Sequence, residues 1–248
     1  MIDIQNNSKC VIITGCASGI GQSTTLKYLN MGYYVIGIDI EKCIYDGQFR
    51  YFHCDISDSK SVEALFVAIK KEYKAINYLI HSAGVFFHKS RAMISEMSID
   101  EWNNVLRINL TGTMLVVKNS LDLLKNAEGD KAVVLISSDQ AVKPRAKNCA
   151  YASSKGAIDT FAKACAVELL PYGIRVNSVN PASVQTNFIK RLFENESQMI
   201  ETFKKQNEKM PLGIIKSEEV AEAAYFLGST HSLKITGQSI LIDSGLYL

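Results

Sequence analysis

Residues 10–21 have the sequence CVIITGCASGIG, an apolar run that breaks into a glycine-rich turn before a proline-free stretch continues to Gly32. This pattern predicts a strand, a tight turn and a helix. Because glycine adopts positive φ and carries no Cβ, Gly15, Gly19 and Gly21 allow a ligand to lie against bare main chain. The start of the helix turns unpaired N–H groups and its positive dipole end toward that ligand, so the stretch suits a pyrophosphate.

The spacing Gly-x-x-x-Gly-x-Gly differs from the commonest dinucleotide fingerprint, and an ordinary glycine-rich turn is the alternative interpretation. A dinucleotide is favoured by the next apolar run, over about 33–39, which ends at Asp39. A carboxylate at that place can accept both ribose hydroxyls of an adenosine. It would also repel a 2′-phosphate, because like charges in contact disfavour each other. The sequence therefore predicts NAD, and not NADP, as the cofactor.

The composition indicates one α/β domain over residues 1–248, because a chain of this length can bury a full core. Lysine and arginine number 27 against 25 aspartate and glutamate, and the basic residues are scattered, so no nucleic-acid partner is expected. No apolar run is long enough to span a bilayer and no signal-peptide pattern opens the chain, so we expect a cytoplasmic protein without membrane partners. The six cysteines have neither disulfide nor metal-ligand spacing, so no metal site is expected.

Apolar strand-like runs alternate with longer amphipathic stretches, the pattern of a parallel sheet covered on both faces by helices. We expect an α/β fold, a single doubly wound Rossmann-type domain with a seven-stranded, mostly parallel sheet. The expected strands span about 10–14, 33–39, 50–54, 77–82, 131–137, 174–180 and 238–243. The short gap after Asp39 leaves no room for a crossover helix, so a loop is expected there.

Small and polar residues follow several of these strands. Asp55 and Ile56 come after the third strand, and Ser82-Ala83-Gly84 ends the fourth, on the side of the sheet where such folds bind ligands. A helix is expected from Ser57 or Asp58 to about Tyr73, and a longer one from a capping box at Ser98 and Glu101 to about Lys125. Within the longer helix, Asn109 lies among apolar residues, where a satisfied buried amide is the alternative to a functional role.

Ser138 follows the fifth strand, and Tyr151 and Lys155 open an alanine-rich helix that reaches about Leu170. Residues four apart share a helix face, so Tyr151 and Lys155 project together. A phenol packed beside a lysine stem is the alternative, because short motifs of this kind occur by chance. The reference pKa of tyrosine, about 10, is too high for a base at neutral pH. An ammonium and an oxidised nicotinamide close by would lower it, so Tyr151 could take the proton of a substrate alcohol.

In order and spacing, these residues resemble the short-chain dehydrogenase/reductase family over nearly the whole chain. The family motifs are matched at Thr14-Gly15-x3-Gly19-Ile20-Gly21, Asp55, Ala83-Gly84, Asn109, Ser138, Tyr151, Lys155, Pro181 and Thr186. The resemblance implies that Tyr151 is the catalytic acid/base and that Ser138 orients the substrate. It further implies that Lys155 holds the ribose hydroxyls and lowers the pKa of Tyr151, and that Asn109 supports a water-mediated proton relay.

The resemblance also implies the contacts of the cofactor. Asp55 and Ile56 would flank the adenine, while Val184 and Thr186 would bind the carboxamide. The cofactor-binding residues expected in total are Gly15, Ser18, Gly19, Ile20, Gly21, Asp39, Asp55, Ile56, Ser82, Ala83, Gly84, Tyr151, Lys155, Pro181, Val184 and Thr186.

The chain departs from the family pattern at two places that carry no reacting group. His81-Ser82 replaces the usual Asn-Asn, which would alter sheet hydrogen bonding, and Ala182 replaces the glycine that follows Pro181, which would stiffen one turn. Cys16 stands where NADP-dependent members often carry a basic residue, and its neutrality agrees with NAD.

The leading hypothesis is an NAD-dependent oxidoreductase, a short-chain alcohol dehydrogenase or carbonyl reductase acting on a secondary alcohol or ketone. Its substrate would be a small molecule: a sugar, polyol, cyclic diol or hydroxy acid. The alternatives are a 3-oxoacyl-type carbonyl reductase, a silent dinucleotide-binding sensor or scaffold, and an epimerase or dehydratase. Residues 187–212 suggest a substrate lid or a packed helical pair. A homotetramer or homodimer is expected from the resemblance, through the helices that begin near Ser98 and Tyr151.

Overall fold

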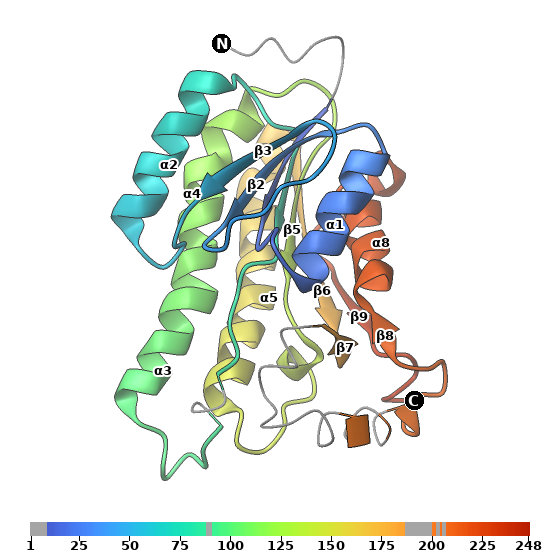
Figure 1. The fold of residues 1–248 in the computed structure, drawn as a ribbon. Helices are drawn as coiled ribbons and strands as arrows, with labels where there is room; N and C mark the ends of the chain where they lie inside the picture. Colours follow the sequence, from blue (N-terminus) through green and yellow to red (C-terminus); the bar gives the residue numbers. More distant parts are fainter. Residues whose placement is uncertain (1–8, 88–90, 187–199, 202–203, 205–206) are drawn as a thin grey trace.

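A parallel sheet of seven strands forms the centre of the computed structural model, which describes residues 9–87, 91–186, 200–201, 204 and 207–248 (Figure 1). Its strand order is β3-β2-β1-β4-β5-β6-β9, and every pairing is parallel. The strands are β1 (Cys10–Thr14), β2 (Tyr34–Asp39), β3 (Phe49–His53), β4 (Tyr78–His81), β5 (Lys131–Ile136), β6 (Ile174–Pro181) and β9 (Ser239–Ile242). The expected doubly wound α/β fold and its seven strands are confirmed.

Helices cover both faces of this sheet (Figure 1). On one face, α2 (Ser59–Glu72), α4 (Gly112–Lys125) and α5 (Cys149–Leu169) pack in one apolar cluster with the strands. On the other, α1 (Gly19–Asn30) and α8 (Ser217–Leu227) pack in a second. The central strands β1, β4 and β5 are almost wholly apolar and buried because both of their faces are covered.

The switch in winding direction determines where a ligand can bind. The chain runs outward from β1 through β2 to β3, then returns to place β4 on the other side of β1. The loops that follow β1 and β4 therefore separate at the carboxyl end of the sheet, which opens a crevice. The glycine-rich turn lies there. Between β2 and β3 no helix forms, as the short gap predicts.

The long helix expected from Ser98 to Lys125 is continuous but not uniform. It consists of α3 (Ile99–Leu106), a π-helical turn η2 (Arg107–Thr111) and α4. Its start is capped as expected, because the Ser98 hydroxyl accepts from the Glu101 N–H at 3.2 Å. The π-helical turn is not visible in the apolar spacing, and it surrounds Asn109. Such single turns are often found at functional sites.

Several short elements were not expected. The two-stranded sheet of β7 (Val184–Gln185) and β8 (Ile215–Lys216) pairs Val184 with Ile215, from segments far apart in the chain. Short 3₁₀ turns occur at η3 (Asp139–Ala141), η4 (Leu170–Tyr172) and η5 (Thr230–Ser232). Two- and three-residue elements are too short to show a periodicity, so the sequence pattern could not reveal them.

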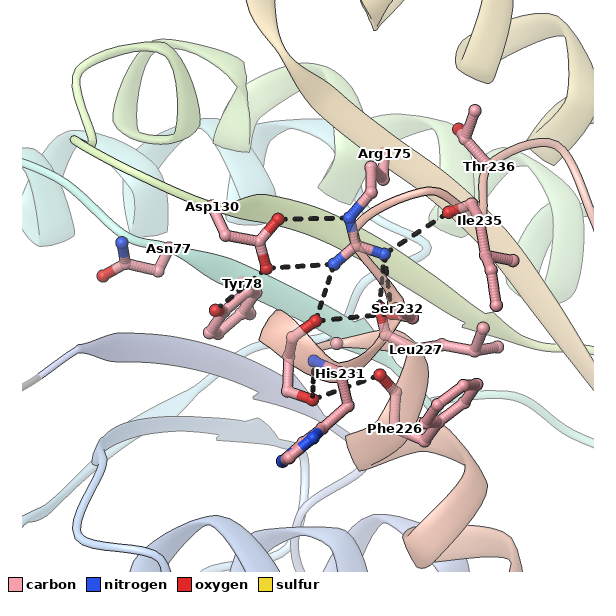
Figure 2. A network of polar contacts seen from close by, with 12 residues as sticks. Asn77, Tyr78, Asp130, Arg175, Phe226, Leu227, His231, Ser232, Ile235 and Thr236 are labelled. Atoms are coloured by element: carbon pink, nitrogen blue, oxygen red, sulfur yellow. Dashed lines mark hydrogen bonds and ion pairs between the residues drawn. The ribbon is translucent and has the colours of Figure 1, made fainter.

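A buried ion pair fastens the amino end of the sheet (Figure 2). Arg175 donates to both carboxylate oxygens of Asp130, through Nε at 3.1 Å and Nη2 at 3.0 Å. Its remaining N–H groups donate to the carbonyl oxygens of Leu227, Ser229 and Ile235 and to the Ser232 hydroxyl. The Arg175 and Asp130 side chains are 7% and 6% exposed. This network joins the starts of two strands to the end of α8, far from the crevice.

Candidate functional site

A cavity of about 710 Å³ opens at the carboxyl ends of the strands. It has the size range of a small-molecule or cofactor site. Of the site residues expected from the sequence, Gly21 and Asn109 do not line it, and the others do. Those lining residues are Gly15, Ser18, Gly19, Ile20, Asp39, Asp55, Ile56, Ser82, Ala83, Gly84, Ser138, Tyr151, Lys155, Pro181, Val184 and Thr186.

The glycine-rich turn forms one wall of the cavity. Gly15 has φ of 70°, and a Cβ on it would lie 2.9 Å from the Ala83 backbone nitrogen, so only glycine fits between β1 and β4. Gly21 instead serves packing, since a Cβ there would lie 2.0 Å from the Gly15 carbonyl oxygen. Ser18 is the N-cap of α1 in extended conformation and its hydroxyl caps no N–H, so the helix start keeps donors for an anion.

Asp39 ends β2 with its carboxylate bordering the cavity. One carboxylate oxygen accepts from the Ala17 N–H at 2.9 Å and the other from the Glu41 N–H at 2.9 Å. Each bond uses one lone pair, so both oxygens can still accept a ribose hydroxyl. The glycine-rich turn thus holds the acid in place through Ala17. Cys16 faces away, with its sulfur 3.5 Å from the Cys43 sulfur.

Thr14 and His81 connect the two strands on either side of the crevice, a contact that the family motif at Thr14 did not predict. The Thr14 hydroxyl accepts from the N–H groups of Ser82 and Ala83 at 3.2 and 3.1 Å. Its own proton is thereby directed to His81 Nδ1, 2.9 Å away. Burial lowers the pKa of His81 to about 3, so the ring is neutral. At His81, where a change in sheet hydrogen bonding was expected, the side chain bonds to Thr14 and so links β4 to β1.

Asp55 and Ile56, which the resemblance assigns to the adenine, line the cavity. The Asp55 carboxylate accepts from the Ser57 hydroxyl at 2.7 Å and the Ser57 N–H at 2.9 Å, and the hydroxyl bond is the main reason its pKa is lowered. Arg107, from the π-helical turn, donates to the same hydroxyl. Ile56 is buried against Gly112. This edge of the cavity thus offers a branched apolar side chain beside an ordered carboxylate.

Ser138, Tyr151 and Lys155 meet at the centre of the cavity. Tyr151 and Lys155 lie one helical turn apart on α5, and the Lys155 ammonium is 5.7 Å from the Tyr151 ring centroid. Lys155 donates to the Ile136 carbonyl oxygen at 2.9 Å, which anchors it to the end of β5. The Phe86 ring packs against Tyr151 with centroids 4.6 Å apart. These contacts fix the phenol toward Ser138.

The pKa values at this centre are dominated by burial. Burial raises the pKa of Tyr151 to about 12, while its interactions with Ser138 and Arg145 act in the lowering direction. Burial lowers the pKa of Lys155 to about 8. The resemblance attributes the lowering of the Tyr151 pKa to Lys155, whereas here Ser138 and Arg145 lower it and burial outweighs them both.

Asn109 lies behind the cavity wall. Its amide oxygen accepts from the Val85 N–H at 2.8 Å, and its amide nitrogen donates to the Val85 carbonyl at 3.0 Å and to the Ser154 hydroxyl at 3.1 Å. These bonds satisfy the Asn109 amide, as the alternative interpretation of a satisfied buried amide expects. They also hold the segment after β4 against α5, which places Gly84 near the Lys155 ammonium: a Cβ on Gly84 would lie 3.5 Å from it.

Asp139, Arg145 and Tyr247 form a cluster beside Ser138, and its link to Tyr247 was not predicted from the sequence. Asp139 is 2% exposed and accepts from the Ser138 hydroxyl at 3.0 Å. Its other oxygen accepts from Arg145 at 2.5 Å and from the Tyr247 hydroxyl at 2.6 Å. A polar residue directly after Ser138 was the available signal for Asp139. No local pattern connects it with Tyr247, which lies 108 positions away.

Pro181, Val184 and Thr186 line the side of the cavity formed by β6 and β7. A Cβ on Gly19 would meet the Thr186 side chain at 3.4 Å, so the two walls approach each other here. The expected stiffening at Ala182 requires no unusual conformation, because Ala182 has no positive φ and its N–H donates to the Ile242 carbonyl at 2.8 Å.

Some expectations fall wholly or partly outside the described residues. Of the lid expected over about 187–212, residues 187–199, 202–203 and 205–206 are not described. Within residues 9–87, 91–186, 200–201, 204 and 207–248, no cluster of His, Cys, Asp and Glu is arranged to hold a metal ion. None of the helices in these ranges is long and apolar enough to cross a membrane.

Comparison with known proteins identifies similar chains. A family model described as Enoyl-(Acyl carrier protein) reductase matches residues 15–247. The NAD-dependent glycerol dehydrogenase of Listeria innocua is 30% identical, covering 98% of this chain and 95% of its own length. The D-threitol dehydrogenase of Mycolicibacterium smegmatis is also 30% identical, covering 98% and 94%.

Among solved structures, ligand-free aldohexose dehydrogenase from Thermoplasma acidophilum superposes with a TM-score of 0.89 at 28% identity. The match covers 96% of this chain and 94% of that one. The likeness therefore extends over nearly the whole chain.

Proposed function

Because the chain belongs to the short-chain dehydrogenase/reductase family, and is therefore an oxidoreductase that uses a nicotinamide cofactor, we propose that it oxidises a secondary alcohol of a small polyol or sugar with NAD. The observation that carries this proposal is the meeting of Ser138, Tyr151 and Lys155 in the cavity that the glycine-rich turn and Asp39 border. We also propose that residues 1–248 form one catalytic domain in the cytoplasm.

The residues that line the cavity are suited to binding a dinucleotide. Gly15 and Gly19 have positive φ, and the start of α1 offers donors for a pyrophosphate. Asp39, held by Ala17, would accept the ribose hydroxyls, and Lys155 would bind the second ribose. The choice of NAD over NADP follows from the charge of Asp39, which would oppose a 2′-phosphate.

The chemistry divides between the cofactor and the protein. A bound nicotinamide supplies the acceptor for the hydride. Tyr151 takes the proton of the substrate hydroxyl, and Ser138 fixes the position of the same oxygen. Ser138 and Arg145 favour the phenolate, and the positive charge of an oxidised nicotinamide would act in the same direction. Phe86 covers the Tyr151 ring and excludes water from one side.

A hydroxylated, uncharged substrate is favoured by the charge balance around Arg145. Its guanidinium is already paired with buried Asp139 at 2.5 Å. A substrate carboxylate would have to compete for it. Gln140 and Asn148 also line the cavity, joined by a 2.9 Å hydrogen bond, and they provide amide groups suited to hydroxyls. The glycerol, threitol and aldohexose dehydrogenases named above act on molecules of this class by name.

A 3-oxoacyl-type carbonyl reductase is the second candidate, because the matching family model is described by an acyl carrier protein reductase. We also propose that the chain assembles as a homodimer or homotetramer through α4 and α5. Light scattering at micromolar concentration should give a multiple of 27.5 kDa. A clean monomer would contradict the assembly.

The function is tested by following NADH formation with a panel of polyols, sugars, cyclic diols and hydroxy acids, and NADH consumption with 3-oxoacyl thioesters. We expect turnover with a polyol or sugar. Preference for the thioester would support the second candidate. Binding of NADH without turnover on any member of the panel would support the silent sensor instead.

A further inference from the structure

The Asp139 carboxylate is shared by three donors that come from three places in the chain. Ser138 is its neighbour in sequence, Arg145 lies further along the same loop, and Tyr247 follows β9. Arg145 also donates to the Tyr247 hydroxyl at 3.3 Å. The carboxylate, the guanidinium and the two hydroxyls therefore form a closed cluster that borders the cavity.

The hydroxyl of Ser138 has one proton, and this cluster determines where it points. An ionised carboxylate can only accept, so the 3.0 Å contact directs the Ser138 proton to Asp139. The Gln140 N–H donates to the same hydroxyl oxygen at 3.2 Å. With that proton on Asp139, Ser138 can only accept from a third partner. It donates to the phenolate or to the substrate oxygen only when its proton leaves Asp139, so the carboxylate competes with the reacting oxygen for the Ser138 proton. Asp139 thus determines how Ser138 can act on the reacting oxygen.

We propose that Asp139 is a positioning residue that acts on Tyr151 through Ser138, that Arg145 balances its charge, and that the Tyr247 hydroxyl holds it by a hydrogen bond. This inference rests on the proposed function of Tyr151 as the acid/base. It adds that a residue from the segment after β9 belongs to the machinery that controls Tyr151.

The charges around Tyr151 on all sides agree with this assignment. In the pKa of Tyr151, Asp139 acts in the raising direction and Arg145 in the lowering direction. Lys155 approaches from α5. From the segment after β4, the neutral Phe86 ring covers the phenol. The opposing effects of Asp139 and Arg145 on the Tyr151 pKa can therefore be changed one at a time by substitution.

Tyr247 contributes to the cluster as a neutral donor. Burial and the hydrogen bond to Asp139 raise its pKa to about 12, so it stays protonated at working pH. The Lys143 ammonium lies 5.3 Å from the Tyr247 ring centroid and contacts the face of the ring. Lys143 thus provides a matched control for Arg145: it is a cation of the same loop that contacts the ring of Tyr247.

The test measures the ionisation of Tyr151 in NAD-saturated protein. Tyrosinate absorbance is followed against pH, and the Tyr151→Phe protein in the same background is subtracted. Arg145→Gln should raise the Tyr151 pKa and Asp139→Asn should lower it, each by about half a unit or more, because nearby charges shift a pKa by about 1–3 units when in direct contact. Tyr247→Phe should raise it by less. Lys143→Gln should shift it much less than Arg145→Gln.

Opposite shifts for Arg145→Gln and Asp139→Asn are the signature of a charge balance, which a merely structural role would not produce. Shifts of the same sign, or an equal shift for Lys143→Gln, would overturn the proposal. If Asp139→Asn does not fold, Arg145→Gln and Tyr247→Phe decide: both should raise the Tyr151 pKa, Arg145→Gln by more, and a shift for Arg145→Gln no larger than that for Lys143→Gln would overturn the proposal. The titration needs no substrate, so a failure of this inference is distinct from a failure to find turnover. Where a substrate is found, the acid limb of the kcat/KM profile should move with the titration.

Discussion

Two arginine–aspartate pairs lie at opposite ends of the sheet and have different surroundings. Arg175 and Asp130, at the amino end, are both buried, and protein groups accept from the guanidinium on every side (Figure 2). Arg145 and Asp139, at the carboxyl end, border the cavity, and the Arg145 side chain is 41% exposed. The same chemical pair thus fastens the fold in one place and faces a ligand in the other.

The difference shows that the partners of a charge pair determine whether the pair acts on the fold or on the site. The Arg175 guanidinium donates to backbone carbonyl oxygens of the segment around η5, so its N–H groups are not available to a ligand. Asp139 shares its oxygens with Ser138 and Tyr247, so a change at one member reaches the reacting centre. We expect mutations at the first pair to change stability and mutations near the second to change catalysis.

The largest effect is expected for Arg175→Gln. Removing one partner of a buried, hydrogen-bonded ion pair leaves the other charge uncompensated, which costs about 3–5 kcal/mol of unfolding free energy. Urea denaturation measures it. Lys27→Gln, which breaks the exposed pair with Glu222 between α1 and α8, is the matched control and should cost no more than about 1 kcal/mol. Equal losses of unfolding free energy for Arg175→Gln and Lys27→Gln would contradict the structural role given to Arg175.

Tyr151→Phe should have the next largest effect, and on turnover instead of stability. The ring still packs against Phe86, but the proton acceptor is gone, so kcat should fall at least ~100-fold. NADH binding, followed by fluorescence, and the urea midpoint should change little. A variant that keeps more than a tenth of wild-type kcat would refute the role of Tyr151.

Asp39→Ser should change the choice of cofactor while leaving Tyr151 intact. Losing a charge-assisted hydrogen bond costs ~1.5–3 kcal/mol, which is roughly 10- to 100-fold in kcat/KM for NAD. The same change removes the repulsion of a 2′-phosphate, so NADP should improve. Equal use of both cofactors by the wild-type protein would show that Asp39 does not face the ribose.

Arg145→Gln should have the smallest effect on stability, which sharpens the contrast with Arg175→Gln. Water reaches the exposed guanidinium, and Ser138 and Tyr247 still donate to Asp139, so we expect a loss of about 1 kcal/mol. The comparison is made by urea denaturation of the two variants side by side. A loss as large as that of Arg175→Gln would mean that both pairs serve the fold.

The sequence was sufficient for the centre of the sheet because β1, β4 and β5 are dense apolar runs between turn signals. It also located the glycine-rich turn and the residues around Tyr151, since their spacing follows from strand ends and helix periodicity. The π-helical turn at Asn109 was missed because one extra residue in a turn leaves the apolar pattern almost unchanged. The short pair β7 and β8 has too few residues to show a pattern.

Contacts made by tertiary structure alone were beyond the reach of the sequence. Tyr247 meets Asp139 only because β9 returns beside β6 at the edge of the sheet. Thr14 meets His81 across neighbouring strands that are 67 positions apart in the chain. Neither pair has a local signature, so hydrogen bonding between distant segments had to be seen in the structure.

The most direct test of the central claim is isotope transfer from the alcohol. Polyols or sugars that carry deuterium on each carbinol carbon are incubated with NAD and the protein, and the NADH formed is analysed by mass spectrometry. The account predicts that one deuterium enters the nicotinamide with the wild-type protein, and at a rate at least ~100-fold lower with Tyr151→Phe. NADH without deuterium, or equal rates for the two proteins, would contradict it.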